Sequence, residues 1–113
     1  KELSINSNYI ILDGMLVLKN MDKIIISTEK KILINSSKHI IEFSNSEQII
    51  ENIHHTDTEL KNGTILYINF IGYNNNKIIL YTNGNINIDS EIDITMNCIK
   101  QFIFYDKQWC LVR

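Results

Sequence analysis

The sequence predicts an all-β protein, and three observations carry this prediction. Short apolar clusters recur about every eight residues through the first half of the chain, separated by polar breaks, as short strands joined by tight turns do. Apolar and polar residues alternate over residues 86–98, apart from an expected turn at Asp89-Ser90, which is typical of a sheet with one buried and one solvated face. No helical period persists for two turns, although a Ser cap and three isoleucines within residues 46–60 also allow a short helix.

Length, composition and charge disfavour several classes of protein. A chain of 113 residues fits one domain, and 44% apolar with 21% charged residues is a globular composition. No apolar run approaches the roughly 20 residues of a membrane-spanning helix, so we expect no membrane insertion. The net charge of −2 comes without a basic stripe, which disfavours nucleic-acid binding. The chain starts at Lys1 without a signal pattern, which suggests a piece of a longer protein.

Residues 1–60 form the first of two expected regions, a β-rich stem of short strands. Its apolar residues occupy consecutive positions, so both faces of each strand need cover. The strands therefore either coil into a solenoid or are covered by a second chain, which predicts a β-helix-like or β-prism-like stem. The clusters are Tyr9–Leu12, Met15–Leu18, Ile24–Ile26, Ile32–Ile34, Ile40–Ile41 and Ile49–Ile50.

Residues 61–113 form the second expected region, an antiparallel, β-sandwich-like module. Residues 64–71 are expected to form a long strand, with Leu66, Ile68 and Phe70 on one face, and residues 72–76 are expected to turn it into a hairpin with residues 77–82. Asn83-Gly84 predicts a type I′ turn, because that turn needs positive φ at both central residues and Asn-Gly tolerates it.

The chain is expected to end in a second hairpin, with strands over residues 100–105 and 108–113. If the turn at Asp106-Lys107 has two residues, it fixes the register of the cross-strand pairs, whereas a longer turn would shift every pair. The predicted pairs are Phe104 with Trp109, Phe102 with Leu111 and Ile103 with Cys110. Aromatic pairs of this kind contribute up to about 1 kcal/mol each.

Few side chains suggest chemistry. His54-His55 with Asp57 and Glu59 is the one cluster that suggests a metal site. Adjacent residues of a strand point to opposite faces, so one chain does not readily present both histidines to one ion. We expect exposed loop histidines, no metal and no cofactor.

No catalytic residue is predicted. Asp89, Glu91 and Asp93 would lie about 7 Å apart on one strand face, a spacing compatible with acid–base chemistry on sugars. Their Asn and Thr neighbours indicate a solvated face, without the apolar pocket that raises a carboxyl pKa. The sequence contains no Ser/His/Asp order, Gly-rich phosphate loop or CxxC motif.

Sugar binding is the activity that the polar turns suit best. Tyr73, followed by Asn74, Asn75 and Asn76, is expected at a hairpin tip, where an aromatic ring and amides are accessible to a glycan. Trp109 is expected to pack in a core or between subunits instead, because its strand is apolar on both sides.

The order of motifs in the C-terminal half resembles the module that closes many bacteriophage tailspikes and tail fibres. In that family a Gly precedes the first long strand, a G-N-I segment follows the second, and an aromatic strand, a turn and a Trp lie just before a terminal Arg. The matching residues are Gly63, Gly84-Asn85-Ile86, Phe102 to Tyr105, Trp109 and Arg113, with Ile50-Glu51-Asn52-Ile53 similar to the family's I-x-x-I lead-in. The family's acid after the Trp is replaced here by Cys110-Leu111.

The resemblance implies a homotrimer built on an extended β-helix or β-prism, part of the virion and extracellular. Its implied partners are further copies of the chain and bacterial cell-surface polysaccharide. The candidate packing and trimer anchors are Phe102, Phe104, Trp109, Leu111 and Arg113.

Three functional hypotheses follow from this resemblance and from the residues. The first is a non-catalytic part of a phage receptor-binding appendage, which trimerises and binds host-surface glycan. The second is part of a polysaccharide-depolymerising tailspike whose catalysis lies upstream or between subunits. The third is a bacterial β-solenoid adhesin or carbohydrate-binding module.

Overall fold

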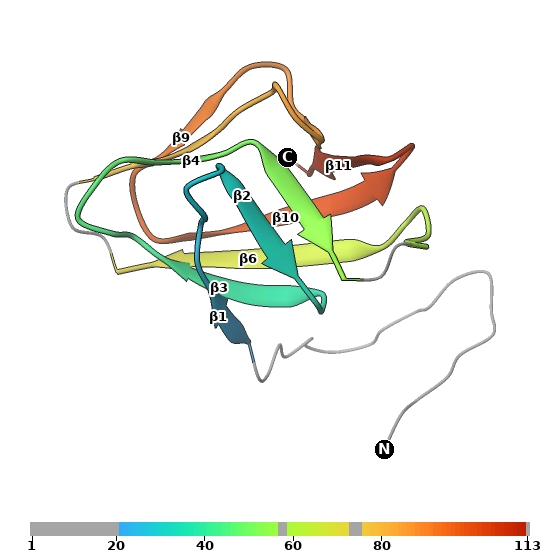
Figure 1. Cartoon of the computed structure of the whole chain (residues 1–113), viewed down its shortest axis with the longest axis horizontal. Helices are drawn as coiled ribbons and strands as arrows, with labels where there is room; N and C mark the ends of the chain where they lie inside the picture. Colours follow the sequence, from blue (N-terminus) through green and yellow to red (C-terminus); the bar gives the residue numbers. More distant parts are fainter. Residues whose placement is uncertain (1–20, 57–58, 73–75, 113) are drawn as a thin grey trace.

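The chain is all-β in the residues that the computed structural model describes, namely 21–56, 59–72 and 76–112 (Figure 1). These residues contain no helix, so none that is long and apolar enough to cross a membrane. The short helix allowed within residues 46–60 is wrong, because two strands occupy that stretch. The strands are β1 Asp22–Ile24, β2 Lys31–Ile34, β3 Lys38–Glu42, β4 Gln48–Ile50, β5 Asn52–His55, β6 Ile65–Ile71, β7 Ile78–Leu80, β8 Ile86–Asn87, β9 Ile92–Ile94, β10 Cys98–Tyr105 and β11 Gln108–Leu111.

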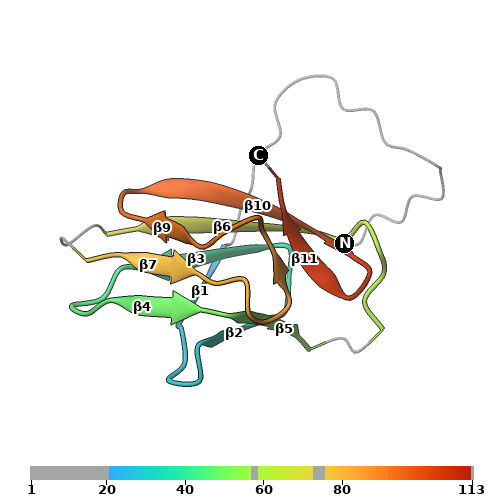
Figure 2. The same ribbon diagram turned by 90° about the horizontal axis from the view of Figure 1, so that it is seen from above.

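The strands form three sheets that the chain visits in turn. The six-stranded sheet has the order β1-β3-β6-β10-β11-β8, the three-stranded sheet β4-β7-β9, and the two-stranded sheet β2-β5. From β3 the chain passes to β4 and then β5, returns to β6 beside β3, and continues to β7 beside β4. Whenever the chain returns to a sheet in this way, the new strand pairs parallel with the earlier one. The parallel pairs are β1–β3, β3–β6, β2–β5 and β4–β7. The chain therefore winds around a shared interior (Figure 2).

On the next pass of the chain, the side chain of Asn85 takes the place of a third strand beside β5. The Ile53 N–H donates to Asn85 Oδ1 at 2.8 Å, and Asn85 Nδ2 donates to the Ile53 carbonyl oxygen at 2.7 Å. The amide side chain thus offers the donor and acceptor that a neighbouring strand would offer. The backbone N–H of Asn85 also donates to Asn52 Oδ1 at 3.1 Å.

Gly84 makes this close approach of two segments sterically possible. A β-carbon at this position would collide with the carbonyl oxygen of Glu51 and the side chain of Asn52. Its φ is not positive, and the positive-φ residues include neither Asn83 nor Gly84. The predicted type I′ turn at Asn83-Gly84 is therefore wrong, and the glycine serves close packing instead.

Antiparallel strands close one end of this winding. β9 pairs antiparallel with β7, and β10 pairs antiparallel with β6 and with β11. Figure 2 shows β9 and β10 at one end of the stacked strands and β4 and β2 at the other. At that other end β1, β2 and β4 are the edge strands of their sheets. The described chain thus has a closed end and an open end.

One of the two predicted hairpins exists. β10 and β11 pair with Phe104 opposite Trp109, Phe102 opposite Leu111 and Ile103 opposite Cys110, so the predicted register is confirmed. Asp106 and Lys107 have φ values of 51° and 63°, as a two-residue type I′ turn requires.

The hairpin expected between residues 64–71 and 77–82 is wrong. β6 pairs with β3 and β10, whereas β7 belongs to the three-stranded sheet. A strand, a polar break and a second strand give the same local pattern whether the chain reverses or turns a corner into another sheet.

A single apolar core fills the space between the sheets. Leu66, Ile68 and Phe70 share one face of β6, as predicted, and this face is fully buried. The core contains residues from both sides of position 60, and β3 and β4 pair with strands that follow it. Ile25 and Leu33, which are 78% and 61% exposed, are apolar side chains outside this core.

His39 ties the first pass of the chain to the second. The side chain is 1% exposed, its Nδ1 donates to the Asp22 carbonyl oxygen at 3.2 Å, and its Nε2 accepts from the Asn35 N–H at 3.3 Å. The imidazole therefore bridges the start of β1 and the turn before β3.

Replacing Gly84 with Ala should lower the free energy of unfolding by about 2 kcal/mol, because an added methyl group meets backbone atoms that cannot easily move. Thermal or urea unfolding measures the change. Asn83→Ala, at the exposed neighbouring position, should stay within about 0.5 kcal/mol of the wild type. An equal loss in both variants would contradict the assigned role of Gly84.

Replacing His39 with Leu should lower the free energy of unfolding by about 1–2 kcal/mol, because two backbone groups lose their partners. His54→Leu, at an exposed position, is the control and should change stability little. A His39→Leu protein as stable as the wild type in urea would contradict the bridging role.

Candidate functional site

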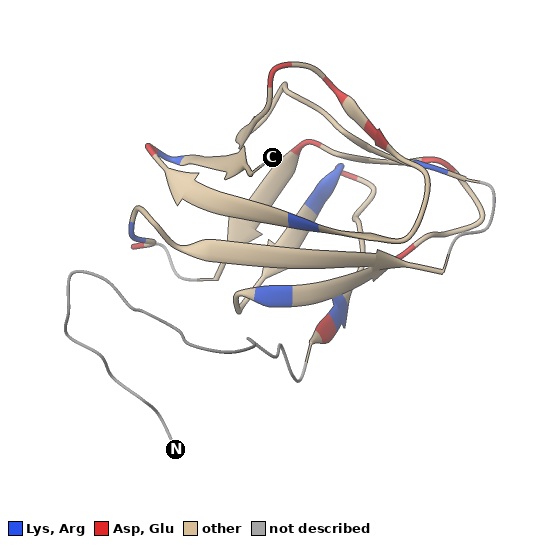
Figure 3. Cartoon of the chain, turned by 180° about the vertical axis from the view of Figure 1, so that it is seen from behind, with Lys and Arg blue, Asp and Glu red and all other residues tan. Residues whose placement is uncertain are grey.

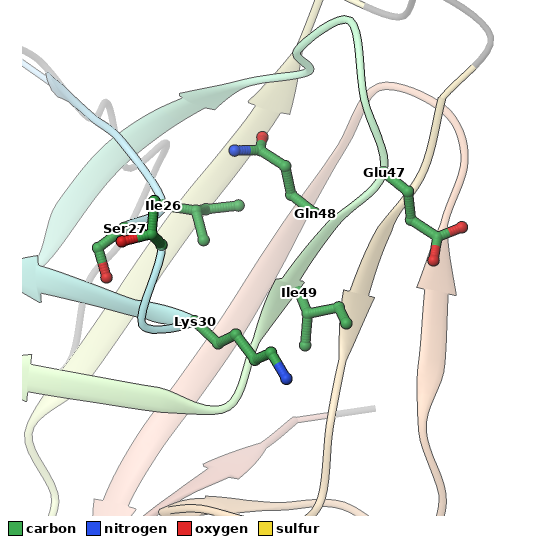
Figure 4. A pocket seen from close by; sticks show the side chains of 7 residues that line it. Ile26, Ser27, Lys30, Glu47, Gln48 and Ile49 are labelled. Carbon is green, nitrogen blue, oxygen red and sulfur yellow. The ribbon is translucent and has the colours of Figure 1, made fainter.

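A hollow of about 240 Å³ lies at the open end of the winding, between the segment after β1 and the outer edge of β4. Figure 4 shows that Glu47 points away from the other labelled side chains. The two charged side chains that line the hollow already have ion-pair partners. Lys30 Nζ lies 3.8 Å from Glu51 Oε1, and Glu47 Oε2 lies 3.8 Å from Lys77 Nζ. The lining residues are Ile26, Ser27, Thr28, Lys30, Glu47, Gln48 and Ile49.

The open end is largely apolar beyond this hollow. A neighbouring hollow of about 270 Å³ shares Ile26 and Gln48 with it, and its other lining residues are the apolar Ile24, Ile25 and Phe43 and the polar Lys23, Glu42 and Ser44. Apolar walls beside sheet edges suit the packing of further polypeptide, and they offer no evident reacting group.

A second site, which we call the hairpin groove, lies between β5 and the closing hairpin. It has a volume of about 350 Å³ and brings together β5, the segment before β8, β10 and the turn at residues 106–107. Its lining residues are Ile53, His54, His55, Leu60, Asn85, Phe104, Lys107 and Trp109.

Two aromatic rings form the apolar part of the hairpin groove. The centroids of Phe104 and Trp109 lie 5.1 Å apart, with the ring planes at 58°. Trp109 is only 1% exposed and belongs to the core, whereas Phe104 is half-buried. Phe104 is therefore the more accessible ring, while Trp109 packs inside the single chain.

The polar part of the hairpin groove is rich in hydrogen-bond donors. His54 and Lys107 are exposed, and His55 is half-buried. Asn85 lines the groove too, but its side-chain amide already bonds the Ile53 backbone. Among the described lining residues there is no carboxylate. The groove can therefore attract an anionic group more readily than a cationic one.

The polar tip predicted to bind glycan falls mostly outside the described residues. Tyr73, Asn74 and Asn75 lie there, as does Arg113. Asn76 donates from Nδ2 to the Ser44 carbonyl oxygen at 3.2 Å, which links the corner before β7 to the corner before β4. Asn76 thus has a local structural contact.

The remaining predicted anchors lie in or against the chain's own core. Phe102 is fully buried on β10, opposite Leu66 of β6, and Leu111 packs against the core from β11. Phe104 packs there as well, beside Trp109.

The residues considered for metal binding and catalysis do not converge. In the described part of the chain, no three His, Cys, Asp or Glu side chains gather closely enough to hold a metal ion. Asp89 and Glu91 precede β9 and Asp93 lies within it, so the three carboxylates do not share a strand. Lys77 Nζ donates to Asp93 Oδ2 at 3.2 Å, and this hydrogen bond raises the pKa of Lys77.

The outer face of β6, β10 and β11 is the largest feature that sequence analysis missed. Strand register places eight uncharged side chains together on this surface, which we call the uncharged face. Figure 3 shows β6 without a charged residue along its length. The face consists of Ile65, Tyr67, Asn69, Ile71, Ile99, Gln101, Ile103 and Cys110.

The border of the uncharged face carries charges that neutralise one another. On β3, Lys38 pairs with Tyr67 and Glu42 with Ile71, so both point to the same side. Glu42 Oε2 lies 3.0 Å from Lys23 Nζ on β1. The absence of charge at odd positions of residues 65–71 and 99–103 was a signal for this face, but only the β6–β10 pairing joins the two stretches.

Comparison with protein-family models, with curated proteins and with solved structures finds no match to this chain.

Replacing Phe104 with Ala should move the fluorescence emission of Trp109, the only tryptophan, to longer wavelength, because the ring that covers it is lost. Tyr105→Ala, at a neighbouring position that is 63% exposed, is the control and should leave the spectrum unchanged. Emission of the wild type like that of free tryptophan would contradict the burial of Trp109.

Proposed function

We propose that this chain is the closing part of a bacteriophage receptor-binding appendage, which assembles as a homotrimer and attaches to polysaccharide on the bacterial surface. The resemblance of its C-terminal half to the tailspike and tail-fibre module motivates the proposal. Two features of the fold support it: the parallel winding with its antiparallel closing strands, and the uncharged face.

The winding is compatible with the end of a β-helix. Parallel strands stacked pass upon pass need a cap, because an unpaired final edge would recruit other strands. Here antiparallel pairs, β9 with β7 and β10 with β6 and β11, interrupt the parallel stacking at this end, and the short strands β8 and β9 are the outer edges. In the described residues no strand pairs with the outer edges of β1, β2 and β4, so further turns of a stem could add there, which is how a closing module would join a longer appendage.

The uncharged face is the single observation that most favours self-association. Within it, Ile99 is 59% exposed and Ile65 is 37% exposed, on the neighbouring strands β10 and β6. Copies of one chain meet through the same surface or through surfaces related by rotation, so any charge there is repeated in every subunit. A face without charges avoids this repulsion and gains from burial of isoleucine side chains.

Light scattering of the purified chain at micromolar concentration tests the proposal, with an expected mass of three times 13.2 kDa. Ile99→Glu with Gln101→Glu should dissociate the trimer, because each subunit would bring two like charges to its contacts with the other copies.

Leu33→Glu with Asn35→Glu is the matched control. It adds the same charge at exposed positions on the β2 side of the molecule and should leave the mass unchanged. A monomeric wild type would contradict the proposal, and equal dissociation by both variants would contradict the assigned interface.

A further inference from the structure

We infer that the hairpin groove binds a sugar ring that carries a carboxylate, such as a hexuronic acid. The inference rests on the proposed function, since it specifies the class of polysaccharide that the appendage would recognise. It uses a different surface from the one assigned to self-association.

The groove is held in shape by contacts that a ligand need not supply. The Asn85 side chain is fixed by two hydrogen bonds to the Ile53 backbone. The backbone N–H of Trp109 donates to the Asn85 carbonyl oxygen at 2.7 Å. The turn that carries Lys107 is tied down as well, because the Asp106 N–H donates to Asn62 Oδ1 at 3.1 Å. Preformed walls reduce the entropy lost when a ligand binds.

The apolar side of the groove suits one face of a sugar ring. Phe104 is half-buried and tilted against Trp109, so part of its ring remains accessible beside Leu60. The CH groups of a pyranose form a small apolar face, and an aromatic ring presents a flat apolar surface of similar size.

The polar side favours an acid over a neutral sugar. Lys107 can only donate hydrogen bonds, and the exposed His54 can donate from its ring nitrogens. The amide of Asn85 uses one donor and one acceptor on the Ile53 backbone, which leaves it fewer hydrogen bonds for sugar hydroxyls. A ligand carboxylate would find charge-assisted partners here, and Asp106 in the turn is not among the lining residues.

The test uses three probes: methyl glucuronide, methyl glucoside, which lacks the charge, and acetate, which lacks the ring. Trp109 fluorescence and NMR shifts of the His54 and His55 side chains report binding to the full chain. We expect saturable changes with methyl glucuronide and at least about tenfold weaker binding of the other two. Equal binding of methyl glucoside or of acetate, or no saturable change with methyl glucuronide, would overturn the inference.

Variants separate the groove from general charge effects. Lys107→Gln should weaken methyl glucuronide binding by at least about fivefold, because the ammonium partner is lost. Lys38→Gln, which removes the same charge beside the uncharged face, should leave it unchanged. Equal losses in both variants would overturn the assigned site. A trimer that shows no response to methyl glucuronide would overturn this inference and leave the proposed self-association standing.

Discussion

The hydrogen bonds between the Asn85 side chain and the Ile53 backbone are the constraint on which the rest of the structure depends. Through these two bonds the third pass of the chain lies beside β5, although it forms no strand that pairs with β5. Gly84 allows the backbone to come this close, and Asn85 then leads directly into β8, which pairs with β11. The winding and the closing hairpin are joined at this point. The hairpin groove lies beside the same asparagine, so its shape depends on the same two bonds.

This arrangement gives the two ends and the flank of the molecule different properties. At the closed end, antiparallel pairing adds β9 to β7 and β10 to β6, and the short strands β8 and β9 are the outermost. At the open end, edge strands and apolar hollows can accept further polypeptide. On the flank, the uncharged face groups isoleucines from β6 and β10. An appendage that continues a stem, assembles with copies of itself and meets a glycan would use these three regions separately.

The sequence predicts features that depend on neighbouring residues and misses those that depend on distant ones. The register of the closing hairpin followed only on the assumption of a two-residue turn at Asp106-Lys107, which the structure contains. Alternation placed Leu66, Ile68 and Phe70 on one face of β6, and the structure shows that this face is the buried one. Asn83-Gly84 was misread, since its glycine is required by Glu51, far away in the chain. The hairpin groove was also out of reach, because it joins residues of β5 to the closing turn.

Native-state amide hydrogen exchange at Ile53 tests the central claim most directly. The Ile53 N–H is bonded to the Asn85 side chain, so the account predicts slow exchange, comparable with that of buried Ile68 in the middle of β6. Exchange at Ile53 as fast as that of the exposed Asn83 amide would contradict the claim that Asn85 holds the third pass of the chain in place.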